Sequence, residues 1–312
     1  MLINRTEIPV GQSAKVEVNI AKLPSRTHID IIVTVARSIE PGPTLLLMGG
    51  MHGDEINGIE IVRRIIEKGH HIPAKGTVIC IPIINIYGFI HFSRYVPDGK
   101  DVNRSFPGNR NGSLASRIAY YLMKDIIPKI DYGIDFHTGG ADRKNYPQVR
   151  CLLTDPVNRE LADAFHAPFT IHAKHRPKSL RQSAARLGKR ILVFEGGESA
   201  RFSEQAISHG MDGTLRVMEH LGMLHGQAPT PEYKNQQFMH SSWIRARSSG
   251  IFQGLVSGGD EIRKNQVVGY ITDPFGDYKV ELKSHTQGFV ISLNNNPIMH
   301  QGDAVMHIGV VK

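Results

Sequence analysis

Hydrophobic positions in the first two thirds of the chain follow two different periods. Continuous apolar runs at 44–48 and 78–84 are typical of strands buried on both faces of a sheet. Between these runs, Ile59, Val62 and Ile65 recur at the spacing of one helical face. The same patterns predict further strands at 29–35, 132–136, 149–153, 168–172 and 190–195, and further helices at 113–127, 156–166, 179–187 and 203–221.

Strands that alternate with helices predict an α/β fold, with a mostly parallel mixed sheet flanked by helices. The pattern changes after about residue 225. A proline-containing segment at 227–231 predicts a linker, and 240–312 shows short strand-like runs between Gly, Asn and Pro turns. We therefore expect a larger α/β domain at 1–225 and a smaller all-β domain at 240–312.

The C-terminal segment 259–269 resembles the repeating unit of a biotinyl/lipoyl-type hammerhead. Such carrier domains place a modifiable lysine in a hairpin, but the corresponding turn at 273–277 contains none. We therefore do not expect this domain to carry a cofactor.

Composition and charge exclude several classes of protein. The 312 residues are 40% hydrophobic and 21% charged, and no run approaches the ~20 apolar residues of a membrane span. The N-terminus lacks a signal-peptide pattern, so a cytoplasmic protein is expected. Cys80 and Cys151 stand in apolar runs and are expected to be buried and reduced.

The net charge of +8 comes from scattered basic residues, without the basic and aromatic pattern of a nucleic-acid site. Charge alone leaves two interpretations open. The basic residues either form a solvated surface or draw in a small anionic substrate.

Two predicted strands end on residues that can bind a metal ion. The first is followed by His52 and Glu55, three positions apart at the start of a helix, and the second ends at His137. Ligands of α/β sheets bind at the carboxyl ends of strands. Two histidines and a glutamate, with one position open to water, form a typical catalytic zinc site. Asp135 is placed to orient one imidazole from outside the metal shell.

Four motifs in order carry a family resemblance: Gly-Gly-x-His-Gly-Asp-Glu at 49–55, Asp-x-Asn-Arg-x-Phe-Pro-Gly at 101–108, Asp-Phe-His-Thr-Gly at 135–139 and Phe-Glu-Gly-Gly at 194–197. Together they resemble the succinylglutamate desuccinylase/aspartoacylase family of the zinc carboxypeptidase superfamily. The resemblance implies a carboxypeptidase-like catalytic domain at 1–225, one zinc ion per chain and hydrolysis of an acyl amide. It also implies that the C-terminal domain at 240–312 is a cap that narrows access to the zinc ion.

The resemblance also implies roles for individual residues. Glu195 matches the catalytic glutamate, and Arg94 matches the arginine that polarises the scissile carbonyl. Asn103 and Arg104 match the pair that binds the substrate carboxylate, and Arg181 resembles a further substrate-binding arginine. The spacing of Arg94 and of Arg181 differs slightly from the pattern of the family.

One departure concerns a tyrosine that aspartoacylase brings to its substrate from near the C-terminus. The comparable stretch, 293–297, contains no tyrosine, which argues against an aspartate-type pocket. Tyr270 and Tyr278 are weak candidates for the missing residue.

The sequence therefore predicts a zinc-dependent amidohydrolase, or deacylase, that acts on a small anionic N-acyl amino acid. The candidate substrates resemble succinylglutamate, acetylaspartate or acetyl-diaminobutyrate. Alternatives are a metallocarboxypeptidase that acts on short peptides and a catalytically inactive binding protein. Neither nucleic acid nor membrane is an expected partner, and a homo-oligomer is compatible with the sequence.

Overall fold

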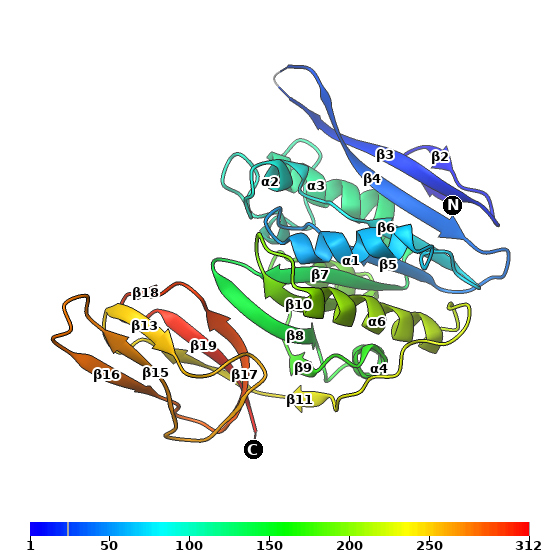
Figure 1. The fold of residues 1–312 in the computed structure, drawn as a ribbon. Helices are drawn as coiled ribbons and strands as arrows, with labels where there is room; N and C mark the ends of the chain where they lie inside the picture. The colour runs from blue at the N-terminus through cyan, green and yellow to red at the C-terminus, as the bar shows by residue number, and fades with distance from the viewer. Residues whose placement is uncertain (24, 312) are drawn as a thin grey trace.

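A mixed sheet of thirteen strands runs through the computed structural model, which describes residues 1–23 and 25–311 (Figure 1). Its centre consists of four parallel strands, in the order β10 (Arg190–Glu198), β7 (Tyr132–Gly139), β5 (Thr44–Met48) and β6 (Thr77–Ile81). Every residue of β5 and β6 is buried, as the continuous apolar runs predicted. The predicted α/β fold class is confirmed, and the parallel pairing is concentrated at the centre.

Antiparallel strands extend the sheet on both sides of this centre. On one side lie β4 (His28–Arg37) and β3 (Ser13–Lys22). On the other side β8 (Arg143–Cys151) pairs with β10, and β9 (Phe169–His172) runs parallel to β8.

Helices cover both faces of the sheet, and α1 (Ile56–Glu67) and α6 (Glu204–His220) lie side by side on one of them (Figure 1). These two helices and α4 (Pro156–Phe165) pack with the apolar side chains of β5 in one core. A second core, on the opposite face, includes residues of α3 (Leu114–Tyr121) and α5 (Leu180–Arg186).

The predicted helix at 113–127 is only partly α-helical. After α3 the chain continues as a π-helical segment, Leu122–Ile126, and then as a short 3-10 turn, Ile127–Lys129. The shorter α2 (Ile86–Ile90) and the 3-10 turn η1 (Val102–Arg104) lie in the connection between β6 and α3.

The C-terminal part contains strands and no helix in the residues described from 236 to 311. Three of them, β12 (Ser241–Arg245), β19 (Ala304–Val310) and β17 (Gly288–Asn294), continue the large sheet because β17 pairs with β8. A separate four-stranded sheet lies beside them, as the figure shows (Figure 1). Its strands are β16 (Lys279–Lys283), β15 (Val267–Thr272), β13 (Gly250–Gly254) and β18 (Ile298–Met299).

The remaining short strands are β1 (Leu2–Ile3), β2 (Thr6–Glu7), β11 (Gln236–Phe238) and β14 (Glu261–Ile262). Cys80 and Cys151 are buried and unpaired, as expected, and burial raises the pKa of both thiols. In the part of the chain that the structure covers, none of the helices has the length and apolar character needed to cross a membrane.

Candidate metal and active site

The three predicted metal ligands meet at the carboxyl ends of two neighbouring strands. His52 and Glu55 lie in the turn that follows β5, and His137 lies near the end of β7. Because β5 and β7 are adjacent and parallel, their carboxyl ends meet at one edge of the sheet. One donor atom from each of the three side chains lies within 4.8 Å of the other two.

Glu55 lies between the two imidazoles. Its Oε1 is 2.8 Å from His52 Nδ1, and its Oε2 is 2.8 Å from His137 Nδ1. The backbone N–H of Thr138 also donates to Oε2, at 3.1 Å. Glu55 is the N-cap residue of α1, yet its side chain makes no capping bond to that helix. Its carboxylate serves the cluster instead.

A second carboxylate lies on the far side of each imidazole. His137 Nε2 is 2.9 Å from Asp135 Oδ2, and His52 Nε2 is 3.2 Å from Asp101 Oδ1. Each ring therefore directs Nδ1 to Glu55 and Nε2 to a carboxylate, an arrangement that fixes tautomer and orientation in metal sites. Asp135 was predicted, whereas Asp101 was not assigned a role, although it opens the motif at 101–108.

Strong electrostatic coupling within the cluster follows from this geometry. Burial opposes ionisation of Glu55, but the two imidazoles hold the pKa of that carboxyl well below its usual range. Burial likewise opposes a charged His137, but Asp135 and Glu55 raise its pKa. The cluster thus stabilises a negative charge on Glu55 and a positive charge on His137 although both side chains are buried.

The donor set fits a zinc ion. Two imidazole nitrogens and one carboxylate oxygen are a common protein ligand set for catalytic zinc, which keeps a further position for water or substrate. All three residues are at most 5% exposed and still line a pocket, so an ion bound by them would face that pocket.

Glycines let the ligand-bearing turn pack against its neighbours. A Cβ on Gly49 would lie 2.6 Å from the backbone of Gly58 in α1, and one on Gly53 would lie 1.8 Å from the backbone of Gly88 in α2. The glycines therefore allow the turn to approach the backbone of both helices closely.

The pocket beside the cluster has a volume of about 430 Å³, within the range of small-molecule sites. All eight predicted site residues line it: His52, Glu55, Arg94, Asn103, Arg104, His137, Arg181 and Glu195. They come from elements spread over more than 140 positions of the chain.

Glu195 lies on β10, directly beside His137 on the parallel strand β7. Its Oε2 accepts a hydrogen bond from Asn145 Nδ2 at 2.7 Å, and its Oε1 is 3.9 Å from Arg150 Nη1. Sequence reasoning missed Asn145 and Arg150, because nothing in the sequence indicates that β8 pairs with β10.

Arg94 and Asn103 are fixed by hydrogen bonds at the pocket wall. Arg94 donates to Asp101 Oδ2 through Nε at 3.1 Å and Nη2 at 2.8 Å, and its Nη1 is 3.2 Å from Glu55 Oε1. The Asn103 side-chain oxygen accepts from the Leu180 backbone N–H at 3.0 Å. Both side chains are thereby held in position.

Arg181 lines the pocket, but its guanidinium donates hydrogen bonds to backbone carbonyls of the pocket wall. It donates to the carbonyl of Arg150 at 3.1 Å and to those of Ala173 and Lys174 at 3.0 and 2.8 Å. Burial lowers its pKa to about 10. These contacts support the shape of the pocket.

The C-terminal domain contributes Trp243 and Ser292 to the pocket lining. Neither of the weak tyrosine candidates lines it: Tyr278 donates to the carbonyl of Ser249, and Tyr270 lies beneath the Lys279 ammonium group. The sequence offered no signal for Trp243 or Ser292, since their position depends on how β12 and β17 join the large sheet.

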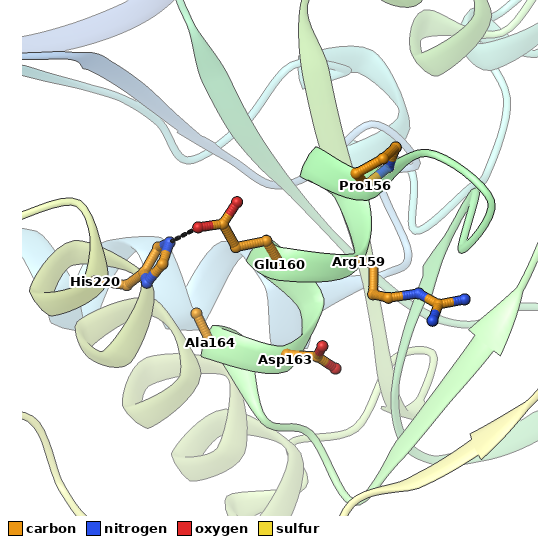
Figure 2. Close-up of a pocket in the computed structure, with 6 residues that line it drawn as sticks. All are labelled: Pro156, Arg159, Glu160, Asp163, Ala164 and His220. Atoms are coloured by element: carbon orange, nitrogen blue, oxygen red, sulfur yellow. Dashed lines mark ion pairs between the residues drawn. The ribbon is translucent and has the colours of Figure 1, made fainter.

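A second hollow lies on the outside of the molecule, between α4 and the end of α6 (Figure 2). Its polar residues include an ion pair between Glu160 Oε1 and His220 Nε2 at 3.2 Å. None of the cluster residues lines it. We therefore assign the candidate active site to the pocket at the strand ends.

Comparisons with known proteins identify the family of the chain. Residues 41–221 match the family model of the succinylglutamate desuccinylase/aspartoacylase catalytic domain. The chain is 28% identical, over 90% of its length and 86% of the relative's, to an N-alpha-acetyl-L-2,4-diaminobutyric acid deacetylase of Halomonas elongata.

Solved structures show the same fold. A succinylglutamate desuccinylase/aspartoacylase from Rhodobacter sphaeroides superposes with a TM-score of 0.85 at 26% identity, over 96% of this chain and 95% of that one. An ectoine utilization protein from Ruegeria pomeroyi, solved with product bound, superposes with a TM-score of 0.84 at 24% identity, over 97% of both chains.

Proposed function

The chain belongs to the succinylglutamate desuccinylase/aspartoacylase family, and from this premise we propose that it is a zinc-dependent amidohydrolase that removes the acyl group from a small N-acyl amino acid. One observation carries the proposal: a buried His-Glu-His cluster and Glu195 open into the same pocket. The relative from Halomonas elongata, named as a deacetylase of an acetylated amino acid, supports the reaction class.

His52, Glu55 and His137 would hold the zinc ion, and Asp101 and Asp135 would orient the two imidazoles. A zinc ion bound by such ligands lowers the pKa of water to about 7 and polarises a carbonyl group. The protein itself has to supply proton transfer and substrate orientation.

Glu195 is the residue proposed for proton transfer. It takes a proton from the attacking water and passes it to the leaving nitrogen of the amide. Asn145 donates to one carboxylate oxygen, so the other oxygen remains available to the water. The register of β10 and β7, which pairs Glu195 with His137, supports this role.

Arg94, Asn103 and Arg104 orient the substrate in this proposal. Arg94, fixed by two hydrogen bonds to Asp101, is directed at the developing oxyanion. Arg104 offers a planar fork that matches the carboxylate of the amino acid, and Asn103 adds a hydrogen bond.

Replacing Glu195 tests the proposal. We expect Glu195→Gln to bind zinc with the wild-type stoichiometry but to release amine from N-acetyl, N-succinyl and N-formyl amino acids at least ~100-fold more slowly, since general acid–base catalysis is lost. Metal analysis and an amine-release assay measure the two properties.

The control is Glu198→Gln, which changes a nearby carboxylate that bonds Asn295 outside the pocket lining. This variant should retain wild-type turnover. Full activity of Glu195→Gln, or no turnover of any acyl amino acid by the zinc-loaded wild type, would contradict the proposal.

Two alternatives differ in the substrate. A metallocarboxypeptidase that acts on short peptides needs a longer groove than this pocket, which Trp243 of the C-terminal domain bounds on one side. An acetyl-diaminobutyrate-type deacetylase has the support of the relative from Halomonas elongata. Because a diaminobutyrate substrate carries an ammonium group, the charges of the residues that line the pocket affect how well it can bind.

A further inference from the structure

Strand β8 lies beside β10 and places three polar side chains near Glu195, the residue proposed for proton transfer (Figure 1). In the register of the two strands, Glu195 pairs with Gln148 and Gly197 pairs with Asn145. Arg150 follows Gln148 by two positions, so these two side chains point to the same face of the sheet. Asn145 holds one oxygen of the carboxylate, and the arrangement of the other two residues indicates a role as well.

Arg150 faces the second oxygen of Glu195. Its Nη1 is 3.9 Å from Oε1, and no other carboxylate of the described residues lies within 4.0 Å of this guanidinium. Both side chains line the pocket and are at most 24% exposed, so solvent screens their attraction only in part. The separation is longer than a hydrogen bond, which leaves Oε1 free to accept one from a water molecule.

Two contacts and the strand itself fix the position of Arg150. Its Nε donates to Gln148 Oε1 at 3.4 Å, and its backbone carbonyl accepts from Arg181 Nη1 at 3.1 Å. The strand is paired on both sides at this residue, with Val193 of β10 and with Ile171 of β9. The guanidinium is therefore attached to the interior of the sheet, where a functional side chain is held more precisely than on a loop.

Gln148 occupies a position that favours an apolar residue. It is completely buried, it pairs with Phe169 of β9, and its Nε2 has no hydrogen-bond partner among the described residues. A buried amide group without a partner destabilises a folded protein. A residue that breaks the local rule in this way, and contacts Arg150 through its other polar atom, is typical of a functional site.

We infer that Arg150 and Gln148 position the carboxylate of Glu195 for proton transfer. Gln148 fixes Arg150, and Arg150 and Asn145 together hold Glu195 so that Oε1 is directed at the attacking water. The proton of that water moves to Oε1 and then to the leaving nitrogen, and Arg150 gains or loses no proton in either step. The inference rests on the proposed function and adds two positioning residues to it.

Replacing Arg150 should affect turnover and not substrate binding. For Arg150→Gln we expect kcat on the best acyl amino acid to fall about 10- to 100-fold while KM changes less than about threefold, because the base is misplaced and the contacts to the substrate remain. Arg150→Lys keeps the positive charge and should recover part of the loss. Zinc titration should give the wild-type affinity for both variants.

Gln148→Leu distinguishes a positioning role from a structural one. Leucine is similar in size and removes the unpaired buried amide, so the Tm should equal or exceed that of the wild type. We nevertheless expect kcat to fall about 3- to 10-fold, with no further fall in the Arg150→Gln background, because Gln148 acts through Arg150. The matched control is Lys144→Gln, an exposed residue of the same strand that faces a different hollow, and it should change neither property.

The ion pair can also be measured without turnover. In the zinc-free protein, Arg150→Gln should lower the midpoint of urea unfolding more in the wild-type background than in the Glu195→Gln background, where the carboxylate is already absent. Such coupling shows that the two side chains interact in solution.

The outcomes separate the two proposals. If Arg150→Gln raises KM at unchanged kcat, if Gln148→Leu retains the wild-type kcat, or if the urea midpoints show no coupling, the positioning role is wrong and the deacylase stands. If the wild type hydrolyses no acyl amino acid, the proposed function is wrong. Coupling in the urea midpoints would then show an ion pair with a structural role only, which also refutes the positioning role.

Discussion

Glu55 shows how one residue departs from the local rule for its position. A carboxylate at the N-cap of a helix normally accepts a backbone N–H of the first turn. Here it accepts instead from Thr138, on strand β7, and contacts both imidazoles. A residue that makes hydrogen bonds to distant residues instead of the local capping bond is typical of a functional site.

The buried side chain of His307 makes the stability of the folded protein depend on pH. It is buried, and burial together with the nearby Arg150 and Arg143 lowers its pKa to about 3. In the unfolded chain the imidazole of His307 has a pKa near 6.5 and binds a proton more readily than in the folded state. The folded state therefore loses stability as the pH falls from about 6.5 toward 3. The contribution is about 1.4 kcal/mol per pH unit in that window.

We expect the free energy of unfolding of His307→Gln, measured by denaturant titration at several pH values, to fall less steeply over this window than that of the wild type. His300→Gln, which changes an exposed histidine of the same domain, is the control and should keep the wild-type slope. Equal slopes for His307→Gln and the wild type would refute the prediction.

At the scale of elements, the site depends on a strand, a turn and two helices packed with little space between them. The turn after β5 passes so close to α1 and α2 that side chains at two of its positions would overlap backbone atoms. Its geometry is therefore set by contacts with α1 and α2, and the ligand positions follow from it.

Gly53→Ala tests this dependence. The new Cβ would lie 1.8 Å from the backbone of Gly88, so α2 or the turn has to move, and we expect a loss of roughly 1–3 kcal/mol of stability together with weaker zinc binding. Thermal unfolding and zinc titration measure both. Gly254→Ala, where the added Cβ makes ordinary contacts of 3.4 Å and longer, should change neither.

At the scale of the whole molecule, one sheet joins the catalytic residues to the C-terminal domain. The pairing of β17 with β8 places Ser292 beside Asn145, which holds Glu195. The division at 225–240 remains a prediction from the sequence, and the large sheet crosses between the two parts. The active-site pocket includes side chains from both.

A metal ion that binds only the folded chain must stabilise it by mass action. At a free zinc concentration 100 times the Kd this amounts to about 2.7 kcal/mol, which corresponds to an increase in Tm of roughly 5 °C or more. Differential scanning calorimetry of the chelator-treated and the zinc-loaded protein measures the shift.

His52→Gln should remove the zinc-dependent shift because it removes one of the three ligands, whereas His70→Gln, outside the cluster, should retain it. An identical Tm with and without zinc in the wild type would show that the cluster does not bind this ion.

The sequence by itself determined the element order, the fold class and the three candidate ligands. Buried strands and helices leave periodic patterns. His52 and Glu55 follow one strand and His137 lies near the end of another, and both strand ends can be located from such patterns. The motifs added Arg94, Asn103, Arg104, Arg181 and Glu195, and the structure brings all of these residues to one pocket.

Only the tertiary structure decided which residues complete the pocket. Asn145, Arg143, Ser292 and Trp243 meet there because β8, β17, β19 and β12 pair in a particular register. A shift of one residue in that register would turn each side chain to the opposite face. Pairing between distant antiparallel strands depends on the packing of the whole sheet, so no local pattern in the sequence reveals it.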